Sequence, residues 1–222
     1  MKFYAICDDE GKGKRKKYAW AFPVYGYPTK KIVCERCNRQ WNDFRPIYEE
    51  RLGFPIALTN EYFADIAGCE AMTMVNEKVK LLIESNSIQS VTFSKMPVIT
   101  QDKLSNEEKK KLRDEGYNVK NLSNINTQYY MLYPEIGANL HESSNFKWVD
   151  EGEYVCKHCG YGVGYELKDY SAPYYIKQSS WNGNDVFRIK ELMGSIVCTE
   201  KFKDLLIEND VSGVCFKEIE AR

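Results

Sequence analysis

The sequence predicts an α+β protein of 222 residues made of two related halves, 1–122 and 123–222, which form one unit over 1–222. Three observations predict this architecture: two distant Cys-x-x-Cys pairs, an internal similarity between the halves, and aromatic residues in alternating, strand-like runs. We expect each half to be a small, mostly antiparallel sheet with one packed helix. A shared four-cysteine zinc site would pin the halves together.

The two Cys-x-x-Cys pairs carry the metal prediction. Cys34 and Cys37 form the first pair, and Cys156 and Cys159 form the second. Two thiolates three positions apart can face one ion, so the pairs together supply a tetrahedral Zn²⁺ site with Zn–S bonds of about 2.3 Å. Such a site is closed to water and substrate, which makes the ion structural. The alternatives are free thiols packed in turns and a thioredoxin-like redox pair, although a redox pair would leave the second Cys-x-x-Cys unexplained.

An internal similarity links the halves. The stretch EKVKLLIESNSIQSVTF at 77–93 aligns without a gap with EKFKDLLIENDVSGVCF at 200–216. Asn76 and Thr199 precede these blocks as good helix N-caps, which places the same helix start in both halves. We infer an internal duplication of a unit that runs strand, zinc knuckle, connector, helix, strand. Chance similarity between two amphipathic helices is the alternative.

Short strands deliver the two knuckles. Residues 2–7 predict an opening strand, and residues 30–33 predict a strand that leads into Cys34. Between them, the basic run Lys12 to Lys17 is typical of a solvated loop, with nucleic-acid binding as the alternative. In the second half we expect strands over Tyr129 to Tyr133 and Phe146 to Val149, and a last strand over Val214 to Ile219.

Two amphipathic helices and one charged helix complete the predicted elements. The helix over 77–85 and its counterpart after Thr199 each place apolar residues on one face, and Phe93 and Phe216 are expected to end the following strands as buried anchors. The apolar positions are Val79, Leu82 and Ile83 in the first helix and Phe202, Leu205 and Leu206 in the second. A further helix has a capping box at Ser105 and Glu108 and a stop at Gly116; we interpret it as a solvated linker, with a binding helix as the alternative.

Composition limits the function classes. The net charge of −1 argues against a broad nucleic-acid-binding surface, and we find no long apolar segment or signal peptide, so we expect a cytoplasmic protein without a membrane span. Phosphate-binding and nucleophile motifs are missing, which predicts no enzyme and no small-molecule substrate. A hydrolase built from His141 and Cys198 is the alternative. We expect the cysteines outside the two pairs to be buried: Cys7, Cys69, Cys198 and Cys215.

Both knuckles and the C-terminal stretch CTEKFKDLLIENDVSGVCFKEI resemble the double-CXXCG motif proteins, which are similar to immunity proteins of bacterial polymorphic toxin systems. Cys156 to Gly160 fits the motif fully, whereas the first pair has Asn38 in place of Gly; Asn tolerates the left-handed conformation that Gly would serve. The resemblance implies that the four cysteines are the family's motif positions, that no residue is catalytic, and that the partner is a cognate toxin protein.

The interaction surface is open to more than one interpretation. The Tyr-rich stretch 161–175, with Tyr174 and Tyr175, is the candidate contact surface, because clustered Tyr is typical of interfaces. The second functional hypothesis is a zinc-ribbon-like nucleic-acid-binding or regulatory module that uses Lys12 to Lys17.

Overall fold

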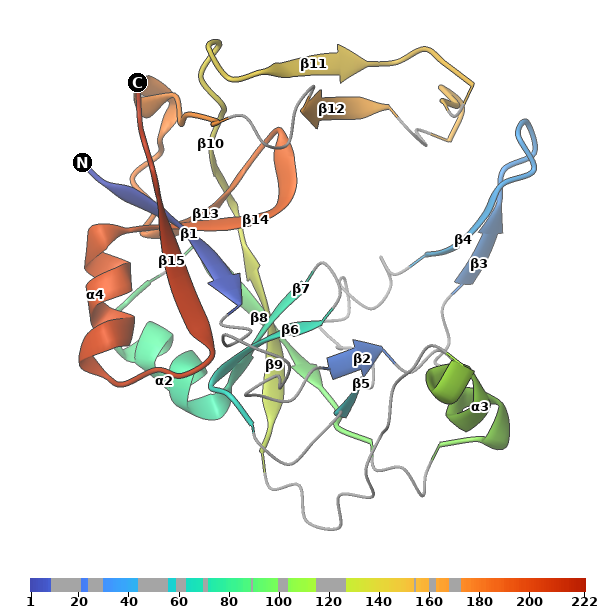
Figure 1. The fold of residues 1–222 in the computed structure, drawn as a ribbon, viewed down its shortest axis with the longest axis horizontal. Coiled ribbons are helices and arrows are strands. Elements are labelled where there is room, and N and C mark those ends of the chain that lie inside the picture. Colours follow the sequence, from blue (N-terminus) through green and yellow to red (C-terminus); the bar gives the residue numbers. More distant parts are fainter. Residues whose placement is uncertain are drawn as a thin grey trace.

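The computed structural model describes residues 1–8, 21–23, 30–43, 56–58, 63–69, 72–88, 90–99, 104–114, 127–153, 155–159, 163–167 and 173–222. Its fold is α+β, with mostly antiparallel sheets and few helices, as the sequence predicts (Figure 1). None of the helices in these residues is both long and apolar enough to cross a membrane.

A four-stranded antiparallel sheet carries helix α2 (Glu77–Ser85). Its strands, in spatial order, are β6 (Ile66–Cys69), β7 (Met72–Asn76), β9 (Tyr129–Pro134) and β8 (Val91–Met96). The helix connects β7 to β8, which are separated in the sheet by β9. The register of β9 runs from Asn76 opposite Tyr129 on one side to Val91 opposite Pro134 on the other.

A five-stranded sheet carries helix α4 (Glu200–Glu208). Its strands, in spatial order, are β10 (Ile136–Ala138), β13 (Val186–Ile189), β14 (Leu192–Thr199), β1 (Phe3–Asp8) and β15 (Val214–Ile219). All neighbours are antiparallel except β10 and β13. Helix α4 connects β14 to β15, and β1 lies between these two strands.

Each sheet therefore takes a strand from the other end of the chain. β1 opens the chain but completes the C-terminal sheet, and β9 follows residue 122 but completes the N-terminal sheet. The division of the chain at 122/123 does not coincide with the division between the sheets. Strands β6-β7-β9-β8 and β13-β14-β1-β15 also have the same order, with a helix at the same connection.

The predicted N-caps start both helices. The side chains of Asn76 and Thr199 accept hydrogen bonds from the backbone N–H groups of Val79 and Phe202, at 3.1 and 3.4 Å. Each cap also donates to an aspartate: Asn76 to Asp65 at 2.7 Å, and Thr199 to Asp185 at 2.8 Å. These bonds satisfy otherwise orphaned groups of the first helical turn and fix the strand-to-helix corner.

The two helices pack into one core shared by both sheets. Val79 and Ile83 of α2 and Phe202 and Leu206 of α4 are fully buried there, which confirms the predicted apolar faces. Leu82 and Leu205 lie at its margin. Separate apolar clusters cover the outer faces, one against β2 (Ala21–Pro23) and β5 (Ile56–Leu58), the other around Phe3, Ile176 and Phe187.

Two expectations for the strands are wrong. Phe93 and Phe216 are half-buried, and each lies mid-strand, because β8 continues to Met96 and β15 to Ile219. Both strands are sheet edges, and both rings pack at the margin of the core that the two sheets share. Met96 and Ile219, which end these strands, are buried.

The charged helix α3 (Asn106–Asp114) begins at the predicted capping box. The Glu108 carboxylate accepts from the backbone N–H of Ser105 at 2.8 Å, and the Ser105 hydroxyl accepts from the N–H of Glu108 at 3.2 Å. Gly116, the predicted stop, lies outside the described residues, as does the basic run Lys12 to Lys17.

Candidate metal centre

The first knuckle lies at the tip of a two-stranded ribbon. β3 (Lys30–Val33) and β4 (Gln40–Asp43) pair antiparallel, and Cys34 to Cys37 lie in their connection. The backbone N–H of Cys34 donates to the Arg39 carbonyl at 2.9 Å, and that of Asn38 donates to the Cys34 carbonyl at 2.8 Å. Asn38 adopts a left-handed φ of 54°, the conformation for which Gly or Asn is suited.

The second knuckle extends from another ribbon. β11 (Phe146–Val149) pairs antiparallel with β12 (Gly164–Leu167), and Cys156 to Cys159 lie between them in the chain. The two ribbons project from the sheets so that their tips meet (Figure 1). A metal ion at this point would join chain segments that are remote in sequence.

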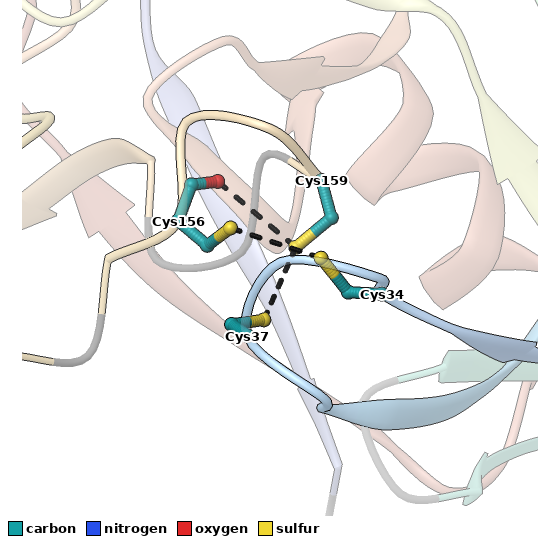
Figure 2. A group of neighbouring side chains, drawn as sticks. All are labelled: Cys34, Cys37, Cys156 and Cys159. Carbon is teal, nitrogen blue, oxygen red and sulfur yellow. Dashed lines mark hydrogen bonds between the residues drawn. The ribbon is translucent and has the colours of Figure 1, made fainter.

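The four predicted thiols come together. The Sγ atoms of Cys34 and Cys156 are 3.9 Å apart, those of Cys37 and Cys159 are also 3.9 Å apart, and all four lie within 4.8 Å of one another (Figure 2). A tetrahedral ion with metal–sulfur bonds of about 2.3 Å would hold its sulfurs roughly 3.8 Å apart. The cluster therefore has the dimensions of a four-thiolate metal site.

Local hydrogen bonds lower the pKa of two of the four thiols, those of Cys156 and Cys34, which favours their thiolate forms. The backbone N–H of Cys159 lowers the pKa of Cys156 to about 6, with a further contribution from the His158 N–H and in spite of burial. The backbone N–H of Cys37 likewise lowers the pKa of Cys34. At Cys37 the N–H of Arg39 lowers the pKa, but burial and the neighbouring thiols outweigh it, so the pKa is raised. A cation would relieve the mutual repulsion of the thiolates.

The histidines lie outside the four-thiol cluster. His158 is exposed on the second knuckle. The His141 ring contacts Ser143 at 2.8 Å and Glu142 at 3.6 Å. Cys198, its partner in the alternative hydrolase, is fully buried in the core under the helices, and burial raises the pKa of its thiol to about 12. A thiol with that pKa is not a ready nucleophile at neutral pH.

The remaining cysteines divide by position in the sheet. Cys198 is buried as expected, whereas Cys7 is half-buried and Cys215 is exposed, so the expectation of burial is wrong for Cys7 and Cys215. Cys7 and Cys215 lie directly opposite each other in β1 and β15, a proximity that the sequence spacing does not reveal. The side chain of Cys69 lies outside the described residues.

Two tyrosines of the Tyr-rich candidate surface are not fully accessible to a partner. Tyr174 and Tyr175 are both half-buried, and burial raises the pKa of Tyr174. The Arg222 guanidinium lies over the Tyr175 ring, 3.4 Å from its centroid. Most of the preceding stretch, 160–162 and 168–172, lies outside the described residues. Tyr165, which falls within the candidate stretch, is exposed on the ribbon of the second knuckle, and beside it lies the exposed Trp148, which sequence reasoning missed.

Comparison with known proteins leaves the family open. No protein-family model matches the chain, and no curated protein matches its sequence.

Proposed function

We propose that this chain is an immunity protein that binds and neutralises a cognate bacterial toxin in the cytoplasm through direct protein contact. The four-thiol cluster carries the proposal, because two remote Cys-x-x-Cys knuckles that converge on one closed site suit a structural clip rather than a reaction centre. The resemblance of both knuckles and the C-terminal stretch to the double-CXXCG motif proteins supports the immunity function. No residue is assigned a catalytic role.

The ion that we propose for Cys34, Cys37, Cys156 and Cys159 is Zn²⁺. Four thiolates in tetrahedral spacing are the donor set of structural zinc sites, and the soft sulfur ligands disfavour Mg²⁺ and Ca²⁺. When bound, the ion would cross-link the two ribbons without offering a position for substrate. The exposed Cys37 and the buried Cys34 would hold it from the first knuckle.

Internal duplication accounts for the common order of the two sheets, and we propose it as the origin of the fold. The helix ends support it: Ser87 and Asp210 follow α2 and α4 with φ of 55° and 48°, and each is followed by a residue whose N–H returns to the helix, Ile88 to Ile83 at 3.2 Å and Val211 to Leu206 at 3.0 Å.

A second correspondence lies in the exchanged strands. Lys80 of α2 lies over the ring of Tyr130 in β9, with its Nζ atom 5.3 Å from the ring centroid. Lys203 of α4 lies in the same way over Tyr4 in β1, at 4.5 Å. Lys80 and Lys203 are aligned in the sequence repeat. Each contacts an inner strand of its sheet, β9 or β1, that comes from the other half of the chain. This shared contact supports duplication over chance similarity between two amphipathic helices.

Growth rescue tests the proposed function. The product of the adjacent upstream reading frame is expressed in cells with and without this protein. We expect the neighbouring product to arrest growth and co-expression to restore it. A harmless neighbour, or equal killing in both cultures, would contradict the immunity function.

The nucleic-acid hypothesis has a separate test. The observation that favours it is the ribbon form of both knuckles, because paired ribbons around one ion occur in zinc ribbons. Retention on DNA or RNA that weakens as salt rises would support this function, whereas the absence of retention at low salt would dismiss it.

A further inference from the structure

The ribbon of β11 and β12 has one aromatic face and one charged face. Trp148 lies directly opposite Tyr165, and their rings meet edge to face with centroids 4.9 Å apart. Phe146, two residues before Trp148, contacts the other side of Tyr165 at 5.7 Å. Lys147 and Glu166 are opposite each other on the alternate face and form an ion pair at 3.4 Å.

Only the base of the aromatic face is covered. Phe146 packs against the apolar cluster on the outer face of the five-stranded sheet. Farther along the ribbon, Trp148 is 54% exposed and Tyr165 is 37% exposed. The apolar surface of the core thus continues onto a projecting arm where no described residue buries it. Neighbouring aromatic side chains that are exposed to solvent in this way are typical of protein contact surfaces.

Three acidic residues lie close in sequence to the exposed Trp148. Asp150, Glu151 and Glu153 follow Trp148 on the way to the second knuckle. Lys157 lies 3.4 Å from Asp150 and 3.5 Å from Glu151. The residues that line an open hollow beside the second knuckle include the acidic Asp150 and Glu151, the basic Arg36 and Lys157, and His158. Four thiolates around a divalent ion would add net negative charge next to it.

We propose that Trp148, Tyr165 and the acidic residues Asp150, Glu151 and Glu153 form a docking surface for the basic face of a protein partner. Lysine or arginine side chains of that partner lie over the exposed rings, where the negative ring faces and the carboxylates both attract them. This inference rests on the proposed immunity function and identifies its contact surface: the toxin would present a basic patch here. A nucleic acid fits less well, since its phosphates would meet the carboxylates.

A metal ion at the four-thiol cluster would fix the position of this docking surface. The ribbon of the second knuckle contacts the body at Phe146, and the four-thiol cluster ties its far end to the first knuckle. A bound ion therefore holds the rings at a fixed place and lowers the entropy cost of docking. The far end of the arm would otherwise be free to move.

Binding of the purified neighbouring gene product, measured by calorimetry, tests the surface. We expect the double variant Trp148→Ala with Tyr165→Ala to bind about 30-fold more weakly or worse, as for hot-spot aromatics. Leu81→Ala and Ile207→Ala are matched controls, because these side chains are 54% and 56% exposed on the helices, and should bind within about twofold of the parent protein. Glu151→Lys with Glu153→Lys should weaken binding and flatten its salt dependence.

The outcomes separate the two proposals. A parent protein that neither binds nor protects would overturn both the immunity function and this surface. Protection by the parent together with undiminished binding by the aromatic variant would overturn the surface alone. Parent-like binding by the charge-reversed variant would overturn the basic partner face. Capture of a single-stranded oligonucleotide by the parent, lost in the aromatic variant, would overturn the class of partner.

Folding controls accompany each variant. Metal content and far-ultraviolet circular dichroism should match those of the parent protein, because the substituted side chains are exposed. Trp148→Arg serves as a second variant if the double substitution disturbs the ribbon. Its alkyl stem can still cover Tyr165, while its charge repels a basic partner. Weakened binding by Trp148→Arg is expected, and parent-like binding would count against the surface.

Discussion

Asp65 ties the start of α2 to the loop before β15. Its carboxylate accepts hydrogen bonds from Asn76 at 2.7 Å, from the Ser212 backbone at 2.9 Å and from the Ser212 hydroxyl at 3.0 Å, with Lys78 at 3.1 Å. Burial raises the pKa of Asp65, but the hydrogen bonds from Ser212, Asn76 and Lys78 outweigh it and hold the pKa below its usual range. One side chain therefore links the helix of one sheet to an edge strand of the other.

We expect Asp65→Asn to lower the free energy of unfolding by about 1–3 kcal/mol at pH 7, the range for hydrogen bonds to a charged group. Because the folded-state pKa is lowered, this stabilisation is complete above the unfolded-state pKa of about 4 and is lost as the pH falls through the folded-state value. Urea unfolding at pH 7 and pH 3 measures it. Glu218→Gln is the control, because the Glu218 side chain is exposed on β15. Equal stability of Asp65→Asn and the parent protein at pH 7 would refute the role of Asp65.

Cys34 is the buried member of the thiol cluster, with only 3% of its surface exposed. Cys34→Ser replaces a soft thiolate with a hydroxyl, so we expect a zinc-poor and insoluble protein. Metal analysis of the purified protein measures the loss. Cys215→Ser is the matched control, because Cys215 is exposed and outside the cluster, and it should retain its metal. A soluble, zinc-replete Cys34→Ser protein would contradict the four-ligand site.

At the scale of elements, the turn before β15 packs against the other sheet. Gly213 has a φ of 83°, and a Cβ atom there would lie 2.1 Å from the Ile66 carbonyl oxygen and 2.4 Å from Ala64 Cβ. Gly183 has a similar φ of 94° but nothing within 4 Å of a Cβ atom. A substitution at Gly183 therefore tests backbone strain alone, whereas one at Gly213 adds a steric clash.

We expect Gly183→Ala to cost about 1–2 kcal/mol, the strain of a left-handed residue. Gly213→Ala should cost about 3 kcal/mol or more, since overpacking adds to that strain and backbone must move. Chemical unfolding of both variants measures the difference. Equal losses would show that the β15 turn can move away from β6 without penalty.

Local elements were predictable where their signals are local. The 3.6-residue periodicity with N-caps at Asn76 and Thr199 predicts α2 and α4, and the Cys-x-x-Cys spacing predicts the cluster. The exchange of β1 and β9 was not predictable, because strand pairing joins residues far apart and alternation does not name the partner. The same holds for Trp148: its pattern predicts a strand, but its exposure depends on where the ribbon projects.

At the scale of the whole molecule, the exchanged strands make the two ends of the chain interdependent. Fragment 1–122 contains β6, β7, α2 and β8 but lacks β9, and fragment 123–222 contains β13, β14, α4 and β15 but lacks β1. Each fragment also holds only one Cys-x-x-Cys pair. A sheet that lacks one of its inner strands leaves backbone hydrogen-bonding groups unpaired and apolar surface exposed, so neither fragment has a complete core.

We therefore expect neither fragment to unfold cooperatively alone, whereas mixing them with Zn²⁺ should restore the sheets and bind about one ion per pair. Circular dichroism and metal analysis before and after mixing measure this. The control is the full chain cleaved between residues 122 and 123 after folding, which should stay assembled. A fragment that folds cooperatively by itself would show that its sheet closes without the exchanged strand, and the molecule would then be two separable units joined by the metal.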